Sequence, residues 1–254
     1  MWIAAFVLLA ITALGALAYD RFGDVLKPHL SLILAFGGAF LIGIIFNHLV
    51  PETYALNPKA GWIVVLGFLI QGVLEYGSQG VEHGHLHVHQ HHSNSKMPLA
   101  MFLSLCLHAF IESMPLHTDT HHHHHAHAHD GHFHLHGIEG VDSTLLIGLI
   151  LHKFPVALVL MGMLDAMGLG RKLRWVALIL FGLMPLFGML SYQGLINLGG
   201  AMAEQVPLWA GGILIGILLH ISTTILFEAG DGHRFNRNKL LVTIAGLALA
   251  LFST

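Results

Sequence analysis

His108 and Glu112 are ionisable residues inside an apolar stretch that runs from about Met97 to Pro115. Because an α-helix turns once per about 3.6 residues, two side chains four positions apart lie on the same face. An imidazole and a carboxylate at membrane depth are costly unless they meet a partner, a cation or water. His152 offers another imidazole in a second apolar stretch. We expect the three to form one site for a divalent metal, zinc above all; two unrelated polar groups used in helix packing are the alternative.

The composition indicates a membrane protein. Of the 254 residues, 55% are hydrophobic and only 10% are charged, and the mean hydropathy is +0.71. A membrane-spanning helix needs about 20 mostly apolar residues, and about eight such stretches fit in this chain. We therefore predict an all-α fold, a polytopic transmembrane bundle of eight helices, which fills residues 1–254 as a single domain. A lone cysteine, Cys106, excludes an intrachain disulfide and a cysteine-rich metal cluster.

The predicted spans are separated by short polar segments and by two longer histidine-rich segments. Basic residues set the orientation of such a chain, because they are concentrated on the cytoplasmic side. With both termini outside the cytoplasm, nine Lys and Arg residues fall on the inner side, Lys59 alone falls on the outer side, and Lys153 is buried. The spans are expected at 2–19, 30–50, 61–76, 97–115, 143–164, 175–195, 208–227 and 240–252.

Histidine is concentrated in the two longer segments. Residues 77–96 contain six histidines and are predicted to be cytoplasmic, whereas residues 117–139 contain eleven and are predicted to be extracytoplasmic. Alternating histidines and small residues cannot build a packed core, and such a composition is typical of metal binding. We expect both segments to bind metal; whether transport requires them is left open.

Two further pairs of residues are candidate metal ligands. His48 and Glu52 are four apart at the outer end of the second span, where they could form an entrance site or simply be solvated. His220 and Glu228, with Thr224 between them, form a polar stripe along the seventh span. This stripe could line an exit, or it could join neighbouring helices by hydrogen bonds.

Lys153 is an unexpected neighbour for a metal ligand. Its ammonium follows His152 directly and would repel a cation. It could pair with Glu112 when the site is empty, occupy the place of a second metal, or point away from the site. Pro155, three residues after His152, cannot donate a hydrogen bond to the carbonyl of Leu151, so a helix kink is expected beside the site.

With these residues in view, the chain resembles the ZIP (Zrt-/Irt-like) family of divalent metal transporters. The resemblance extends over the whole length and includes the eight spans, the outer termini and a cytoplasmic histidine-rich segment between spans three and four. It rests on three runs of residues: His48-Leu49-Val50-Pro51-Glu52, His108-Ala109-Phe110-Ile111-Glu112 and His152-Lys153-Phe154-Pro155-Val156.

The chain departs from the family pattern at several positions. Ala109, Lys153 and Val156 stand where family members often have metal ligands. By this resemblance, most of the second metal of a two-metal centre is missing, and one transport site remains. The long outer histidine-rich segment is also not general for the family.

We predict that this integral protein of the cell (inner) membrane is a transporter and not an enzyme. It would move Zn²⁺ into the cytoplasm by alternating access around a mid-membrane site, with Fe²⁺, Mn²⁺, Co²⁺, Ni²⁺ and Cd²⁺ as other candidate substrates. A metal exporter, an intramembrane metalloenzyme and a non-transporting metal sensor or storage protein are the alternatives. The predicted partners are divalent metal ions and the lipid bilayer, without nucleic acid; a homodimer is left open.

Overall fold

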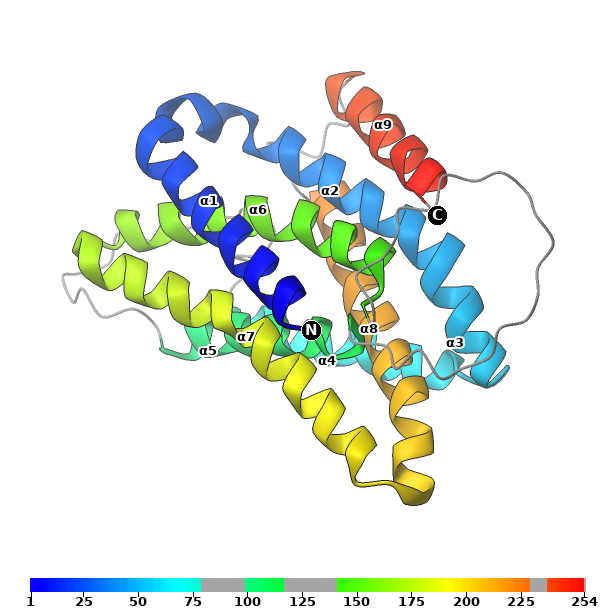
Figure 1. Ribbon diagram of the computed structural model, residues 1–254. Coiled ribbons are helices and arrows are strands. Elements are labelled where there is room, and N and C mark those ends of the chain that lie inside the picture. The colour runs from blue at the N-terminus through cyan, green and yellow to red at the C-terminus, as the bar shows by residue number, and fades with distance from the viewer. Residues whose placement is uncertain (79–98, 117–140, 229–236, 254) are drawn as a thin grey trace.

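A computed structural model describes residues 1–78, 99–116, 141–228 and 237–253 (Figure 1). The described regular elements are all helical apart from a single bridge residue, Val141. The α-helices are α1 (Trp2–Leu26), α2 (Leu30–Ile44), α3 (Val50–Leu56), α4 (Gly61–Ser78), α5 (Leu99–Glu112), α6 (Ser143–Ala166), α7 (Arg171–Asn197), α8 (Gly200–Glu228) and α9 (Arg237–Ser253). Both predicted histidine-rich segments, 77–96 and 117–139, lie outside the described residues, apart from Gly77 and Ser78 at the end of α4.

Five helical stretches among the described residues are long and apolar enough to cross a membrane. They are Trp2–Leu56, Leu99–Leu116, Ser143–Ala166, Arg171–Asn197 and Gly200–Phe227, and α4 contains a shorter apolar stretch. Many large apolar side chains on these helices are exposed, as a lipid-facing surface requires; examples are Trp2, Phe6, Val73 and Phe227. The chain is therefore a polytopic helical membrane protein, in agreement with the all-α prediction. The number of eight spans stays a prediction.

Several helices are longer than the apolar stretches that predicted them. The polar turn expected after Tyr19 is instead helical as far as Leu26, with a kink at Phe22, where φ is −131° and ψ is 17°. α7 begins at Arg171 and α8 at Gly200, each ahead of its predicted span. Hydropathy marks the membrane-embedded length of a helix, whereas backbone hydrogen bonding continues into the polar ends until a residue breaks it.

The α2 helix does not run evenly into α3. Residues Ile45–Leu49 form a π-helical segment, η2, which contains His48. Pro51 follows within the first turn of α3 and lacks the N–H that would bind the carbonyl of Asn47. π-Helical turns occur often at functional sites because they rotate the side chains that they carry.

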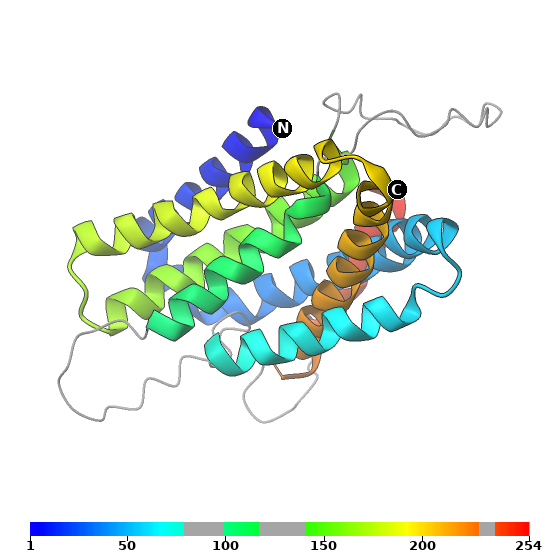
Figure 2. The ribbon, with the colours of Figure 1, turned by 90° about the horizontal axis from the view of Figure 1, so that it is seen from below.

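Two groups of helices pack most extensively among themselves. The α1 bundle consists of α1, α5, α6 and α7, since α1 packs on α6 and α7, and α5 on α7. The α2 bundle consists of α2 with α3, α4, α8 and α9, since α2 packs on α8 and α9, and α4 on α8 (Figures 1 and 2). The bundles meet where α2 packs on α6, α4 on α5, and α8 on α7 and α5. α6 is central to the molecule, since 78% of the residues in its most apolar stretch are buried.

Candidate metal site

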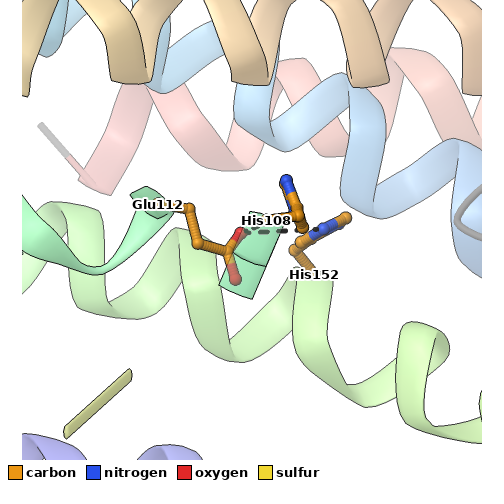
Figure 3. Close-up of side chains that lie close together, drawn as sticks. All are labelled: His108, Glu112 and His152. Atoms are coloured by element: carbon orange, nitrogen blue, oxygen red, sulfur yellow. Dashed lines mark ion pairs between the residues drawn. The ribbon is translucent and has the colours of Figure 1, made fainter. Parts of the chain in front are cut away.

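The centre of the molecule holds the three residues that the sequence predicted as a site. α5 supplies His108 and Glu112 from one face, and α6 supplies His152 from the opposite side (Figure 3). The Glu112 Oε2 atom lies 3.1 Å from Nε2 of His108 and 4.0 Å from Nε2 of His152. The exposed fractions of these residues are 1%, 0% and 2% for His108, Glu112 and His152. Side chains from α5 and α6 thus bring three ionisable groups together in the buried interior.

This donor set is suited to a metal ion. One ligand atom from each of His108, Glu112 and His152 lies within 4.8 Å of the others. Two imidazole nitrogens and a carboxylate oxygen are ligands that zinc accepts, with a fourth tetrahedral position left for water or another donor. The group could therefore hold a metal ion, and its ligand types do not single out one metal.

Lys153 faces the same carboxylate. Its ammonium forms an ion pair with Oε1 of Glu112, while Oε2 faces the imidazoles. The ammonium nitrogen also lies 5.0 Å from the centre of the Phe181 ring, close enough for a cation–π interaction. Of the alternatives that the sequence allowed for Lys153, the structure therefore shows the pairing with Glu112. The positive charge balances the carboxylate in the absence of metal.

Gln71 contacts the central group and was missed in the sequence. It lies on α4 with no exposed surface, and its Oε1 is 3.1 Å from Nδ1 of His108. Since an amide oxygen only accepts hydrogen bonds, Nδ1 of His108 carries the proton in this arrangement. Nε2 then has a lone pair that can bind a metal ion, and partners such as Gln71 fix this tautomer in metal-binding histidines. The sequence feature that could have identified Gln71 is its position as a glutamine within an apolar span.

A second group of metal-ligand types lies where α2 and α3 approach the start of α6. Nε2 of His48 is 2.8 Å from Oδ2 of Asp142, and Nδ1 of His48 is 3.6 Å from Oε1 of Glu52. One ligand atom from each of the three lies within 4.8 Å of the others. The sequence predicted His48 and Glu52 but not Asp142. Asp142 stands just before Ser143 and the apolar run of α6, a helix-capping signature whose partners in space the sequence does not reveal.

His220 contacts a neighbouring helix, which is one of the two alternatives that the sequence left open for this stripe. Its Nε2 lies 2.5 Å from Oε2 of Glu75 on α4. Thr224, in the middle of the predicted stripe, donates a hydrogen bond from its hydroxyl to the backbone oxygen of His220, so this bond lies within α8. Glu228 is the last residue of α8, and its side chain lies outside the described part of the chain.

The face of α4 connects two of these groups. Gln71 and Glu75 are one helical turn apart; Gln71 contacts His108, and Glu75 contacts His220. A series of polar side chains therefore leads from the central group along α4 to α8.

Comparison with known proteins adds no family assignment. No protein-family model matches this chain. No curated protein matches it either. The fold and the site define the class by themselves: a polytopic helical membrane protein with a buried histidine and glutamate cluster that could hold a metal ion.

Proposed function

We propose that this protein is a divalent metal transporter of the ZIP type that moves Zn²⁺ into the cytoplasm. The observation that carries the proposal is the convergence of His108, Glu112 and His152 at the centre of a bundle of membrane-spanning helices. Ionisable ligands buried at membrane depth are costly, and binding of a cation offsets that cost. The eight spans, the outer termini and the resemblance of three sequence runs to the ZIP family belong to the same proposal.

The arrangement of the helices supports alternating access. All three central ligands lie on α5 and α6 of the α1 bundle, whereas their neighbour Gln71 lies on α4 of the α2 bundle. A metal bound to the central ligands can therefore travel with the α1 bundle as it moves against the α2 bundle. Movement would break the His108–Gln71 hydrogen bond and would leave the ligand set itself intact.

The remaining polar groups supply a route. Metal would be gathered by the outer histidine-rich segment, pass His48 and Glu52, and reach the central ligands. It would leave past His220, with Glu75 and Glu228 on the inner side, toward the cytoplasmic histidine-rich segment. The basic residues set this orientation, because most of them fall on the side that the proposal makes cytoplasmic.

Lys153 supports transport of one ion at a time. Its ion pair with Glu112 places a positive charge where a second metal would have to bind. A single divalent ion held by two neutral imidazoles and one shared carboxylate is bound less firmly than an ion between several carboxylates. Moderate affinity favours release, which transport requires.

Zinc uptake into proteoliposomes that contain the full chain tests the proposal. We expect inward flux from the wild type and its loss in His108→Gln and in His152→Gln. The matched control is His29→Gln, since His29 is an exposed histidine remote from the ligand group. Unchanged uptake in both central variants contradicts the site, and outward flux indicates an exporter.

A metal sensor or storage protein is the second candidate. Lys153 favours it, because a neutralised carboxylate makes an empty site stable without a transport cycle. Zinc binding that depends on His108 and His152, without flux in either direction, would identify this function.

A further inference from the structure

The group of His48, Glu52 and Asp142 differs from the central group in one respect: its ligands come from both bundles. His48 lies in η2 and Glu52 in α3, which continue α2, whereas Asp142 precedes α6. The central ligands His108, Glu112 and His152 all lie on the α1 bundle. A metal ion held by the first group therefore joins the two bundles, while an ion at the centre does not.

Backbone hydrogen bonds fix the position of Asp142 in this group. Oδ1 of Asp142 accepts a hydrogen bond from the backbone N–H of Leu145 at 2.9 Å, which caps α6. The backbone N–H of Asp142 donates to the oxygen of Leu116 at 3.2 Å. Oδ2 is thereby directed at His48, which the π-helical segment presents from the other bundle. Well-supported ligands of this kind bind metal more tightly than ligands on loose segments.

The exposure of the group suits exchange with solution. The side chain of Asp142 is 10% exposed and that of His48 is 22% exposed, but that of Glu52 is 61% exposed. One imidazole and two carboxylates are ligands for zinc and similar divalent ions. An ion can therefore reach this group without any movement of the bundles, unlike the buried centre.

Two other polar side-chain contacts between the bundles are single hydrogen bonds. His108 contacts Gln71, and the hydroxyl of Ser104 donates to the backbone oxygen of Leu74. Such bonds break and reform at small net cost, because their groups find other partners. A metal ion shared by three side chains is a stronger connection.

We propose that a divalent metal ion bound by His48, Glu52 and Asp142 bridges the two bundles and holds them in this arrangement, so that excess metal slows transport. A ligand that binds one arrangement stabilises it in proportion to its occupancy. The inhibition rests on the proposed transport function, whereas the bridging site does not. Transport then limits itself. At a low metal concentration the ion fills only the central site, and at a high concentration it also occupies the bridging site.

The bridge is tested by the distance between spin labels on the two bundles in the full chain with Cys106→Ser. Labels at Leu56→Cys, the last residue of α3, and Leu198→Cys, just after α7, occupy exposed positions. We expect zinc to narrow the distance distribution, and Asp142→Asn to abolish this narrowing. Asparagine caps a helix as well as aspartate does, so α6 is preserved. His48→Gln is a second variant with the same expected result.

Glu204→Gln is the matched control, because it removes an exposed carboxylate from the start of α8. The distance distribution of this control should narrow on zinc addition as that of the wild type does. The proposal is overturned if zinc still narrows the distance distribution in both Asp142→Asn and His48→Gln. It is also overturned if zinc does not narrow the distribution in the labelled protein that retains His48 and Asp142.

The uptake rate tests the consequence. We expect the initial rate of zinc uptake by the wild type to fall at high zinc, and the rate of Asp142→Asn to rise to a plateau without that fall. A fall that is equal in both proteins overturns the inhibitory role. If zinc narrows the distance through Asp142 while no variant shows flux, the proposed transport function fails and the bridging site is retained.

Discussion

Lys153 and Glu112 form a buried ion pair between α6 and α5, with 1% of each side chain exposed. The carboxylate is shared: Oε1 meets the ammonium, and Oε2 lies 3.1 Å from Nε2 of His108. Glu112 is thus both the partner of a fixed cation and the anionic ligand of the proposed metal site. Its two oxygens connect charge balance in the empty site with metal binding in the loaded one.

Replacement of Lys153 should make folding stability depend on metal. Lys153→Met leaves the Glu112 carboxylate buried without a cation, a loss that typically costs about 3–5 kcal/mol. Zinc supplies the missing charge, so the rise in Tm on zinc addition should be larger than in the wild type. Thermal unfolding of detergent-solubilised protein, with zinc and with a chelator, measures this. Lys59→Met removes an exposed lysine and should behave as the wild type.

Gln71 should act on the metal through His108. Gln71→Leu removes the acceptor that fixes the proton on Nδ1, and loss of such a partner typically weakens metal affinity by about 10–100-fold. The KM for zinc uptake should rise accordingly. Gln71→Glu retains an acceptor oxygen and should stay closer to the wild type. A KM for Gln71→Leu equal to that of the wild type would refute this role for Gln71.

Protons should compete with the metal. Zinc binds neutral imidazole, so each ion displaces the protons that His108 and His152 carry, and the affinity rises with pH. We expect the KM for zinc to increase as the pH falls, because a protonated imidazole cannot bind the metal. The zinc affinity of His152→Gln, measured by binding, should depend less on pH than that of the wild type. A pH-independent KM would contradict a site with two imidazoles.

The position of α5 should depend on a glycine in α7. A Cβ atom at Gly188 would collide with the backbone oxygen of Phe110, two residues before Glu112, whereas one at Gly194 would meet nothing within 4 Å. Gly188→Ala should therefore lower stability by about 1–3 kcal/mol, as overpacking does, and weaken zinc binding. Gly194→Ala on the same helix should leave both the stability and the zinc binding unchanged. Thermal unfolding and the KM for uptake of the two variants decide the matter.

The sequence was sufficient for the features that depend on local periodicity. Its apolar runs predicted helices close to those observed, and spacing predicted that His108 and Glu112 share a face. Both follow from the fixed geometry of a helix. Helix ends were less well predicted: α1 continues past its apolar run to Leu26, because polar residues end the lipid-facing part of a helix without ending the helix itself.

Only the tertiary structure decided which side chains meet across helices. Gln71 contacts His108, Asp142 contacts His48, and Glu75 contacts His220. Each pair joins positions 37 or more apart in the chain, and spacing along one helix gives no information about its rotation against another. The stripe predicted from His220 to Glu228 illustrates this, since the His220 side chain pairs across to α4.

The sequence by itself thus determined the class of protein and the residues able to bind metal. The tertiary structure decided how they are grouped: His152 joins His108 and Glu112 within one bundle, whereas Asp142 joins His48 across two. The reason is physical. Hydropathy and helical spacing are properties of each segment alone, but a metal site is set by distances that arise only when helices pack.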